Sequence, residues 1–188
     1  MEKLFAVCAP GLEPFTALEL DRLGLSGSHP ASQSKHFPTE KGPPDDRQVP
    51  RPASGGMGGE LQSGGIEFQG SLHDVYRANL YLRTASRVLV RLGEFYASAF
   101  PELRRKASRL LWENYLAPER PIALRVTCQK SRLYHEAAVS ERVAGAIADR
   151  LGKPPPVQKY LEDSGIDLPQ LIVVRIVDNL CTISMDSS

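Results

Sequence analysis

The sequence predicts an α+β protein made of two consecutive units, and three observations support this prediction. Strand-like and helix-like segments alternate over most of the 188 residues, of which 41% are hydrophobic, enough for a core in each unit. Residues 26–64 interrupt the alternation, since 19 of these 39 positions are Pro, Gly or Ser. Residues 171–186 then give the clearest hairpin pattern. We expect units at residues 1–98 and 99–188.

The first unit is predicted to be a small sandwich of ferredoxin-like kind, with strands and helices alternating around one sheet. Strands are expected at residues 3–8, 65–69 and 87–97, and helices at residues 13–23 and 71–83. Ser71 and Asp74 fit a capping box that opens the second helix. In that helix Leu72, Val75, Tyr76 and Leu80 recur at helical spacing, which predicts that they face the core.

Residues 26–64 are expected to be a disordered insertion inside the first unit. Their only large apolar residues are Phe37, Met57 and Leu61. Such a segment cannot bury enough surface to offset the entropy cost of ordering it. We therefore expect no specific function from its histidines and lysines.

The second unit is predicted to be an α/β arrangement. Helices are expected at residues 101–111 and 140–151, and strands at residues 122–128, 171–177 and 180–186. Val143, Ile147 and Leu151 recur every four residues, which indicates the core face of the second helix. Asp178 and Asn179 tolerate the positive φ of a tight hairpin turn. The continuously apolar strand 171–177 should be central in its sheet, and the alternating strand 180–186 more exposed.

The net charge of +1 conceals an uneven distribution of charge along the chain. Residues 99–160 carry 12 Lys or Arg against 6 Asp or Glu, a local net of +6, whereas residues 161–188 carry 1 against 5. A positive segment of this kind is the electrostatic footprint expected for a polyanion. An ordinary solvated basic helix face would give the same count.

The most informative stretch lies between the predicted strand 122–128 and the helix that follows it. Its candidate ligand-binding residues are Lys130, Ser131, Arg132, Tyr134, His135 and Arg142, and a second basic group comprises Arg104, Arg105 and Lys106. A strand end would hold cations above a helix N-terminus, whose free amides also favour phosphate. Arg142 is expected in the first turn of that helix, where its charge opposes the helix dipole.

Two residues of this stretch allow more than one interpretation. His135 either packs on the sheet or contacts RNA by stacking or through a phosphate, and a single histidine is weak evidence for a general base. Tyr134 either packs under the loop or stacks on a base. For Arg104, Arg105 and Lys106, a solvated helix face competes with phosphate contact.

Signatures of catalysis are missing from the sequence. It shows no nucleophile elbow, Gly-rich phosphate loop or metal-ligand spacing, so no catalytic residue and no metal are expected. Cys8, Cys128 and Cys181 are far apart and odd in number, which favours buried thiols in a reducing compartment. No apolar run reaches 18 residues. We expect a cytoplasmic protein without a membrane span.

Several spaced segments resemble the N-terminal half of THUMP-domain RNA methyltransferases that modify guanine N2 in rRNA or tRNA. The similar segments are residues 4–13 (LFAVCAPGLE), 64–70 (GGIEFQG), 82–89 (LRTASRVL) and 131–135 (SRLYH). They cover almost the entire chain outside residues 26–64, in the family's order. The resemblance implies a ferredoxin-like domain at residues 1–98 and an RNA-binding THUMP domain at residues 99–188.

The resemblance also implies a third, catalytic domain that binds S-adenosylmethionine in the same polypeptide. The Asn/Asp-Pro-Pro-Tyr motif with which such enzymes hold the target amino group is absent, so this chain is expected to be a fragment that binds structured rRNA or tRNA and carries no cofactor itself.

Three alternatives remain open. The THUMP domain could come from a tRNA thiolation or pseudouridylation enzyme, or the chain could be a ferredoxin-like module for protein interaction or metabolite sensing. A small hydrolase on this fold would need a phosphate-cradling loop near the N-terminus, and the turn at residues 9–12 lacks any basic residue.

Overall fold

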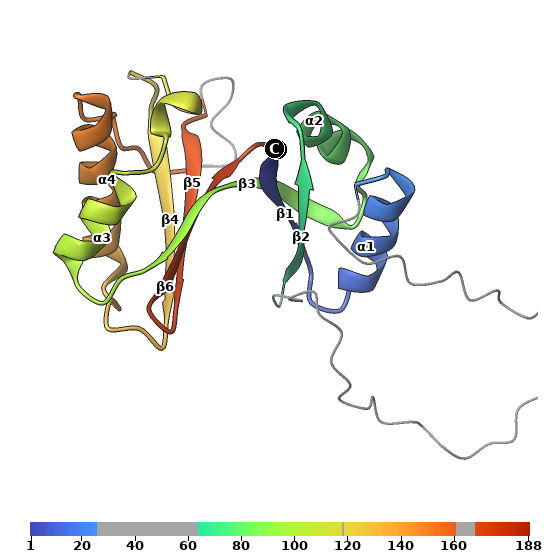
Figure 1. Ribbon diagram of the computed structural model, residues 1–188, viewed down its shortest axis with the longest axis horizontal. Coiled ribbons are helices and arrows are strands. Elements are labelled where there is room, and N and C mark those ends of the chain that lie inside the picture. The colour runs from blue at the N-terminus through green and yellow to red at the C-terminus, as the bar shows by residue number, and fades with distance from the viewer. Residues whose placement is uncertain (26–63, 118, 161–167) are drawn as a thin grey trace, which may run out of the picture.

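The computed structural model describes residues 1–25, 64–117, 119–160 and 168–188 (Figure 1). The predicted insertion, except for Gly64, lies outside these residues. The elements in chain order are β1 (Glu2–Cys8), α1 (Glu13–Arg22), β2 (Gly65–Gly70), α2 (Leu72–Tyr81), β3 (Ala85–Tyr96), α3 (Phe100–Ala107), the 3-10 turn η1 (Trp112–Asn114), β4 (Ile122–Gln129), α4 (Glu136–Leu151), β5 (Gln170–Val177) and β6 (Leu180–Asp186).

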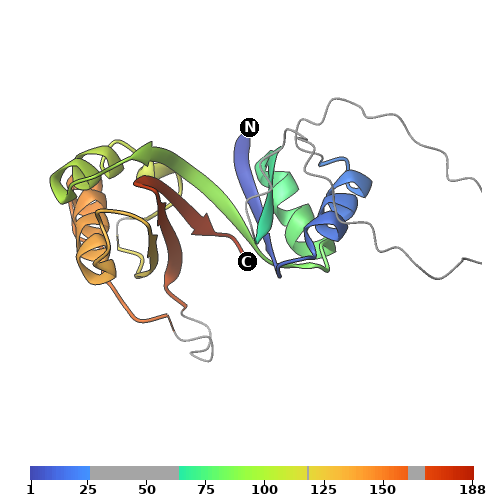
Figure 2. The same ribbon diagram turned by 90° about the horizontal axis from the view of Figure 1, so that it is seen from below.

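The strands described form one twisted sheet in the order β2-β1-β3-β6-β5-β4. Strand pairs are antiparallel except β4 and β5, which run parallel because α4 crosses over between them. Helices α1 and α2 lie at one end of the molecule, and α3 and α4 at the other (Figures 1 and 2). The long strand β3 runs from one end to the other (Figure 1).

Two hydrophobic cores lie on either side of the middle of β3. The first includes Leu4, Phe68 and Val88 beneath α1 and α2, and the second includes Trp112 and Ile147 beneath α3 and α4. The pairing of β3 with β6 shifts register between residues 91 and 93, which is a β-bulge at the point where the strand leaves one core for the other.

Tyr115 connects the two cores outside the sheet. It packs against both hydrophobic clusters, and its hydroxyl donates a hydrogen bond of 2.6 Å to Glu2 Oε2 on β1. Burial, followed by the bond to the Glu2 carboxylate, raises the pKa of Tyr115 to about 12.

The predicted caps and turn are confirmed. Ser71 Oγ accepts a bond from the backbone of Asp74 while the Asp74 carboxylate accepts one from the backbone of Ser71, which is a capping box. Asp178 and Asn179 have φ of 50° and 65°, as a hairpin turn with two left-handed residues requires.

The expected core face of α2 is wrong. Of its four residues only Val75 is buried, whereas Leu72, Tyr76 and Leu80 are 64, 70 and 76% exposed. The side of the helix that contacts the sheet is formed by Val75 and Ala78, continued by Leu82 after the helix ends. Both sets have helical spacing, so periodicity alone could not choose between them.

Three further expectations need correction. Helix α4 begins at Glu136, so Arg142 lies in its second turn and its charge does not oppose the dipole at the helix end. Helix α3 ends at Ala107, because the chain turns into η1 and buries Trp112. Strand β6 is buried over six of its seven residues, because it lies between β3 and β5. The central position expected for β5 is confirmed.

Candidate nucleic-acid interface

The loop of residues 130–135 joins the end of β4 to the start of α4. Leu133 is buried in the second core, and this anchor leaves its neighbours outside. Lys130, Arg132, Tyr134 and His135 are exposed. Lys130 has a φ of 48°, which lets the chain turn sharply as the strand ends. The loop therefore presents two cations and two aromatic rings to solvent.

Asn179, on the β5–β6 turn, holds this loop in place. Its Oδ1 accepts hydrogen bonds from Ser131 Oγ at 3.1 Å and from the backbone N–H of Arg132 at 2.9 Å. Its own carbonyl accepts a bond of 2.9 Å from the N–H of Ala97, just after β3. Through its side chain and its backbone carbonyl, Asn179 thus connects the loop that follows β4 to the β5–β6 turn and to the end of β3. The sequence had indicated it only as a turn residue.

Tyr134 and His135 lie together at the N-terminal end of α4. Their ring centroids are 4.1 Å apart with a tilt of 41°, and Tyr134 is 67% exposed. Of the two interpretations given for each ring, packing under the loop or on the sheet is excluded, because both residues are exposed and Leu133 is the buried residue of the loop. The pair offers an aromatic surface of the kind on which an unpaired base can stack.

The N-terminus of α4 adds a second attraction for anions. His135 is the N-cap and makes no side-chain cap bond, so amides of the first turn point outward with the positive end of the helix dipole. Among the described residues, no ion pair occupies the side chains of Lys130, Arg132 or Arg142. Glu136 in the first turn is the opposing charge.

The basic residues of α3 have a different role. Arg104 donates two bonds of 2.7 Å to the Asp149 carboxylate on α4, and Lys106 donates to Glu102 at 2.8 Å and to the Tyr96 carbonyl at 2.7 Å. The bonds from Arg104 lower the pKa of Asp149. Arg105 is exposed and its side chain makes no ion pair within the described chain. The prediction that all three contact RNA stays a prediction.

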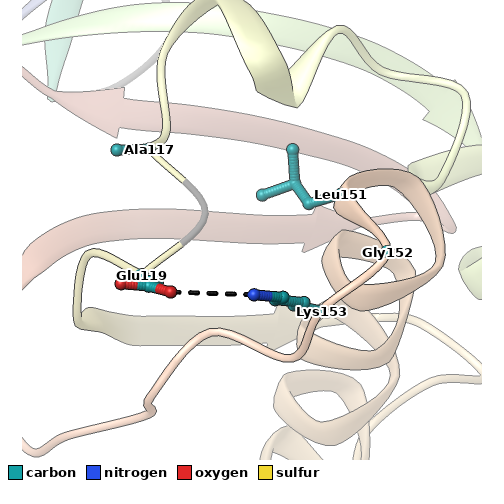
Figure 3. A pocket seen from close by; sticks show the side chains of 5 residues that line it. All are labelled: Ala117, Glu119, Leu151, Gly152 and Lys153. Atoms are coloured by element: carbon teal, nitrogen blue, oxygen red, sulfur yellow. Dashed lines mark ion pairs between the residues drawn. The ribbon is translucent and has the colours of Figure 1, made fainter.

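A hollow at the opposite end of α4 belongs to neither basic group. Ala117, Glu119, Leu151, Gly152 and Lys153 line it, and Lys153 Nζ lies 3.7 Å from Glu119 Oε1 (Figure 3). The 16 residues of α4 separate it from the loop by about 24 Å at 1.5 Å per residue. This hollow therefore does not include the predicted site residues.

Other chemistry is not supported by the described residues. Within them, no group of three or more His, Cys, Asp or Glu is placed to hold a metal, and no helix is long and apolar enough to cross a membrane. The three cysteines are free thiols, and burial raises the pKa of Cys181 to about 12. A raised pKa keeps this thiol protonated and unreactive.

Two family models match the chain, one in each unit. The THUMP domain model matches residues 97–186, the part of the chain that holds the loop and α4. Residues 97–186 form a THUMP domain. The model of the RlmL ferredoxin-like domain matches residues 54–89. The predicted fold class, a ferredoxin-like domain followed by a THUMP domain, is confirmed. The division after residue 98 stays a prediction, because β3 packs against both cores.

Several relatives of this chain are RNA methyltransferases by name. A Synechocystis protein provisionally named an RNA methyltransferase is 26% identical over 187 residues, which are 98% of this chain and 39% of that protein. The ribosomal RNA large subunit methyltransferase K/L of Syntrophotalea carbinolica is 30% identical over 127 residues, 66% of this chain and 17% of the enzyme. The THUMP chain thus spans less than half the length of these relatives.

Solved structures show the same arrangement. A protein of Listeria monocytogenes, described as a predicted N6-adenine-specific DNA methylase, is 27% identical with a TM-score of 0.67, over 98% of this chain and 40% of that one. A 4-thiouridine synthetase in complex with RNA has a TM-score of 0.50 at 11% identity, over 99% of this chain and 41% of that one. The second likeness shows the fold alone.

Proposed function

We propose that this chain is the RNA-binding module of an RNA methyltransferase and that the loop of residues 130–135 is its main contact with RNA. The observation that carries the proposal is the loop's fixed geometry. Asn179 and Leu133 hold it so that Lys130, Arg132 and the Tyr134–His135 pair all point outward. Because the loop is ordered before binding, little entropy is lost when RNA docks.

The surface suits structured RNA better than a small anion. Two unpaired cations and the open end of α4 favour phosphate oxygens, and the exposed rings favour an unstacked base. These groups are exposed side chains on a loop, so recognition would follow the shape of the RNA. Ribosomal RNA and tRNA both offer such combinations of helix and unpaired nucleotides.

The catalytic part of the proposal concerns a longer polypeptide. We place guanine-N2 methylation and S-adenosylmethionine in a methyltransferase domain in cis, and the whole protein in the cytoplasm. The described residues do not fit this cofactor, because their only parallel strand pair, β4–β5, ends in the basic loop and not in a Gly-rich turn. This chain would contribute RNA binding and positioning alone.

A thiolation or pseudouridylation enzyme is the second candidate. It is supported by the shared fold of the 4-thiouridine synthetase. The methyltransferase is favoured because the relatives with detectable sequence identity over two thirds or more of the chain carry that name. A module for protein interaction alone would leave the ordered basic loop without a use.

The test is a titration of the chain with tRNA and rRNA fragments at several salt concentrations. If about four cations each displace a counterion, the slope of log K against log salt should be roughly −3 to −4. Binding that ignores salt, or no binding at low salt, contradicts the proposal.

A paired set of variants locates the contact. Lys130→Ala with Arg132→Ala should weaken RNA binding by about 1–3 kcal/mol without unfolding the protein, because both side chains are exposed and unpaired. Arg22→Ala with Arg83→Ala removes the same charge from exposed positions of the ferredoxin-like domain. Equal losses in the two variants would show that net charge matters and the loop does not.

A further inference from the structure

Helix α2 carries an apolar stripe on its solvent side, formed by Leu72, Tyr76 and Leu80. Spacing of four residues places these side chains along one face, and each is more than 60% exposed. The stripe begins beside the capping box and runs the length of the helix. Exposed apolar groups gathered on one element are the usual mark of an interaction surface.

Residues 187 and 188 lie directly beside this stripe. They continue along β3 beyond the end of β6, since the N–H of Ser187 donates to the Val88 carbonyl at 3.0 Å and the N–H of Val88 donates to Ser188 Oγ at 2.9 Å. Asn79 Nδ2 donates to Ser187 Oγ at 3.1 Å, and Ser188 Oγ donates to Asn79 Oδ1 at 3.0 Å. Figure 1 marks this end of the chain close to α2.

Asn79 belongs to the same side of α2 as the stripe. It follows Tyr76 by three residues and Leu72 by seven, so the three lie next to one another on the helix surface. The other flank of α2 is held by α1, where Arg77 Nη2 donates to the Leu23 carbonyl at 2.7 Å. Any chain that continues from Ser188 therefore starts at the open flank of the stripe.

We propose that the stripe of Leu72, Tyr76 and Leu80 docks the methyltransferase domain of the same polypeptide. This inference rests on the proposed function, which places that domain in cis, and it agrees with the lengths of the relatives, since the chain covers 39% of the Synechocystis protein. A tethered domain meets the stripe at an effective concentration in the millimolar range, so a small apolar contact is enough to hold it.

A second copy of the chain fits the stripe less well. Three side chains offer on the order of 400 Å² of contact, whereas a stable interface between separate proteins buries about 800 Å² on each partner. Docking in cis also has a consequence for RNA. It would fix the distance between the catalytic domain, held at α2, and the basic loop at the other end of the molecule, so that one RNA position reaches the active site.

The first test is photo-crosslinking in the full-length polypeptide. A photoreactive phenylalanine replaces Tyr76, and in a matched control it replaces Leu18, which is 54% exposed on α1. The expected result is an intramolecular crosslink from position 76 to residues beyond 188, at least ten times stronger than from position 18. Crosslinks between two polypeptides, equal yields at the two positions, or none from position 76 would overturn the proposal.

A second test removes the stripe. Leu72→Ser, Tyr76→Ser and Leu80→Ser together should make protease cleavage after Ser188 in the full-length polypeptide about tenfold faster. Phe15→Ser with Leu18→Ser is the control for lost surface apolarity. Unchanged cleavage in the triple variant overturns the docking. RNA titration of residues 1–188 separates the two proposals. If the chain binds RNA but the stripe docks nothing, only the docking proposal fails. If the chain does not bind RNA, the proposed function itself fails.

Discussion

Both domains pack two helices against the sheet, but they differ in the side chains that they expose to solvent. Among the described residues, the THUMP core contains eighteen buried residues, including Trp112, and the ferredoxin-like core ten. The THUMP domain presents a loop with two unpaired cations and two exposed rings, whereas the ferredoxin-like domain presents apolar side chains on both α1 and α2. Charge on the surface suits a nucleic-acid partner and apolar area suits a protein partner, which is the division that the two proposals make.

The junction between the two domains, formed by β3 and Tyr115, determines whether they can fold independently. Strand β3 pairs with β1 over its first half and with β6 over its second half, so it joins the strands of the two domains into one sheet. Tyr115 adds a contact from the THUMP side to β1. We therefore expect the domains to fold as one cooperative unit, although their surfaces serve different partners.

Breaking the THUMP core is the largest perturbation. Ile147→Asp places a charge at a fully buried position, which should cost more than about 4 kcal/mol and unfold the domain. The fluorescence of Trp112, the single tryptophan, reports the folding of the THUMP core. Far-UV circular dichroism reports the secondary structure of both domains. The two signals should be lost together. Loss of tryptophan signal with substantial dichroism remaining would show that the ferredoxin-like core folds alone.

Loosening the loop should reduce RNA binding and spare the fold. Asn179→Gly keeps the positive φ but removes the acceptor that holds Ser131 and Arg132, so RNA affinity should fall by about 1–2 kcal/mol. Asp178→Gly is the matched control, since Asp178 also has a positive φ and does not hold the loop. Equal affinity of the two variants would mean that the loop needs no fixed geometry.

Much of this division was visible in the sequence. The periodic core positions Val143 and Ile147, the capping box at Ser71 and the turn at Asp178 were found because each depends on local rules of spacing and backbone angle. The loop was found because basic and aromatic residues cluster there between a strand and a helix. These features need only neighbouring residues to be recognised.

Other features depend on contacts between distant residues. The stripe on α2 was assigned to the core because two sets of apolar positions share its helical period, and only the sheet decides which set is buried. Asn179 lies 47 residues from Arg132, whose backbone N–H donates to its side chain, so nothing local indicates that it organises the loop. Arg104 likewise bonds to Asp149 across 45 residues, a contact between α3 and α4 that no local pattern indicates.

The hydrogen bond between Tyr115 and Glu2, which joins the two domains, should have a smaller effect on stability that depends on pH. Tyr115→Phe removes the bond to Glu2 and should cost about 1 kcal/mol at neutral pH. The pKa of Tyr115 is raised to about 12 in the folded protein, whereas the usual tyrosine pKa is about 10. The protonated hydroxyl therefore contributes its full stabilisation below about pH 10. This contribution is lost as the pH rises towards 12.

Urea unfolding at pH 8, 10 and 11 measures this effect. The gap in stability between wild type and Tyr115→Phe should be constant up to about pH 10 and shrink above it, because the phenylalanine variant cannot lose that proton. The other tyrosines titrate in both proteins, so their contribution cancels from the difference. A gap that does not change with pH would mean that this contact between the domains is made only weakly in solution.

The smallest expected effect separates two neighbouring cations of α3. Arg104→Ala should lower stability slightly, and by more than Arg105→Ala, because its two bonds to Asp149 join α3 to α4 at a partly exposed site. Arg105→Ala should leave stability within about 0.5 kcal/mol of wild type but reduce the salt slope of RNA binding by up to about 0.9, the value of one phosphate contact. Paired urea and salt titrations measure both quantities. If Arg104→Ala lowers the slope as much as Arg105→Ala, the Asp149 pair opens on binding, and the RNA-facing surface of the THUMP domain extends from the loop across α3.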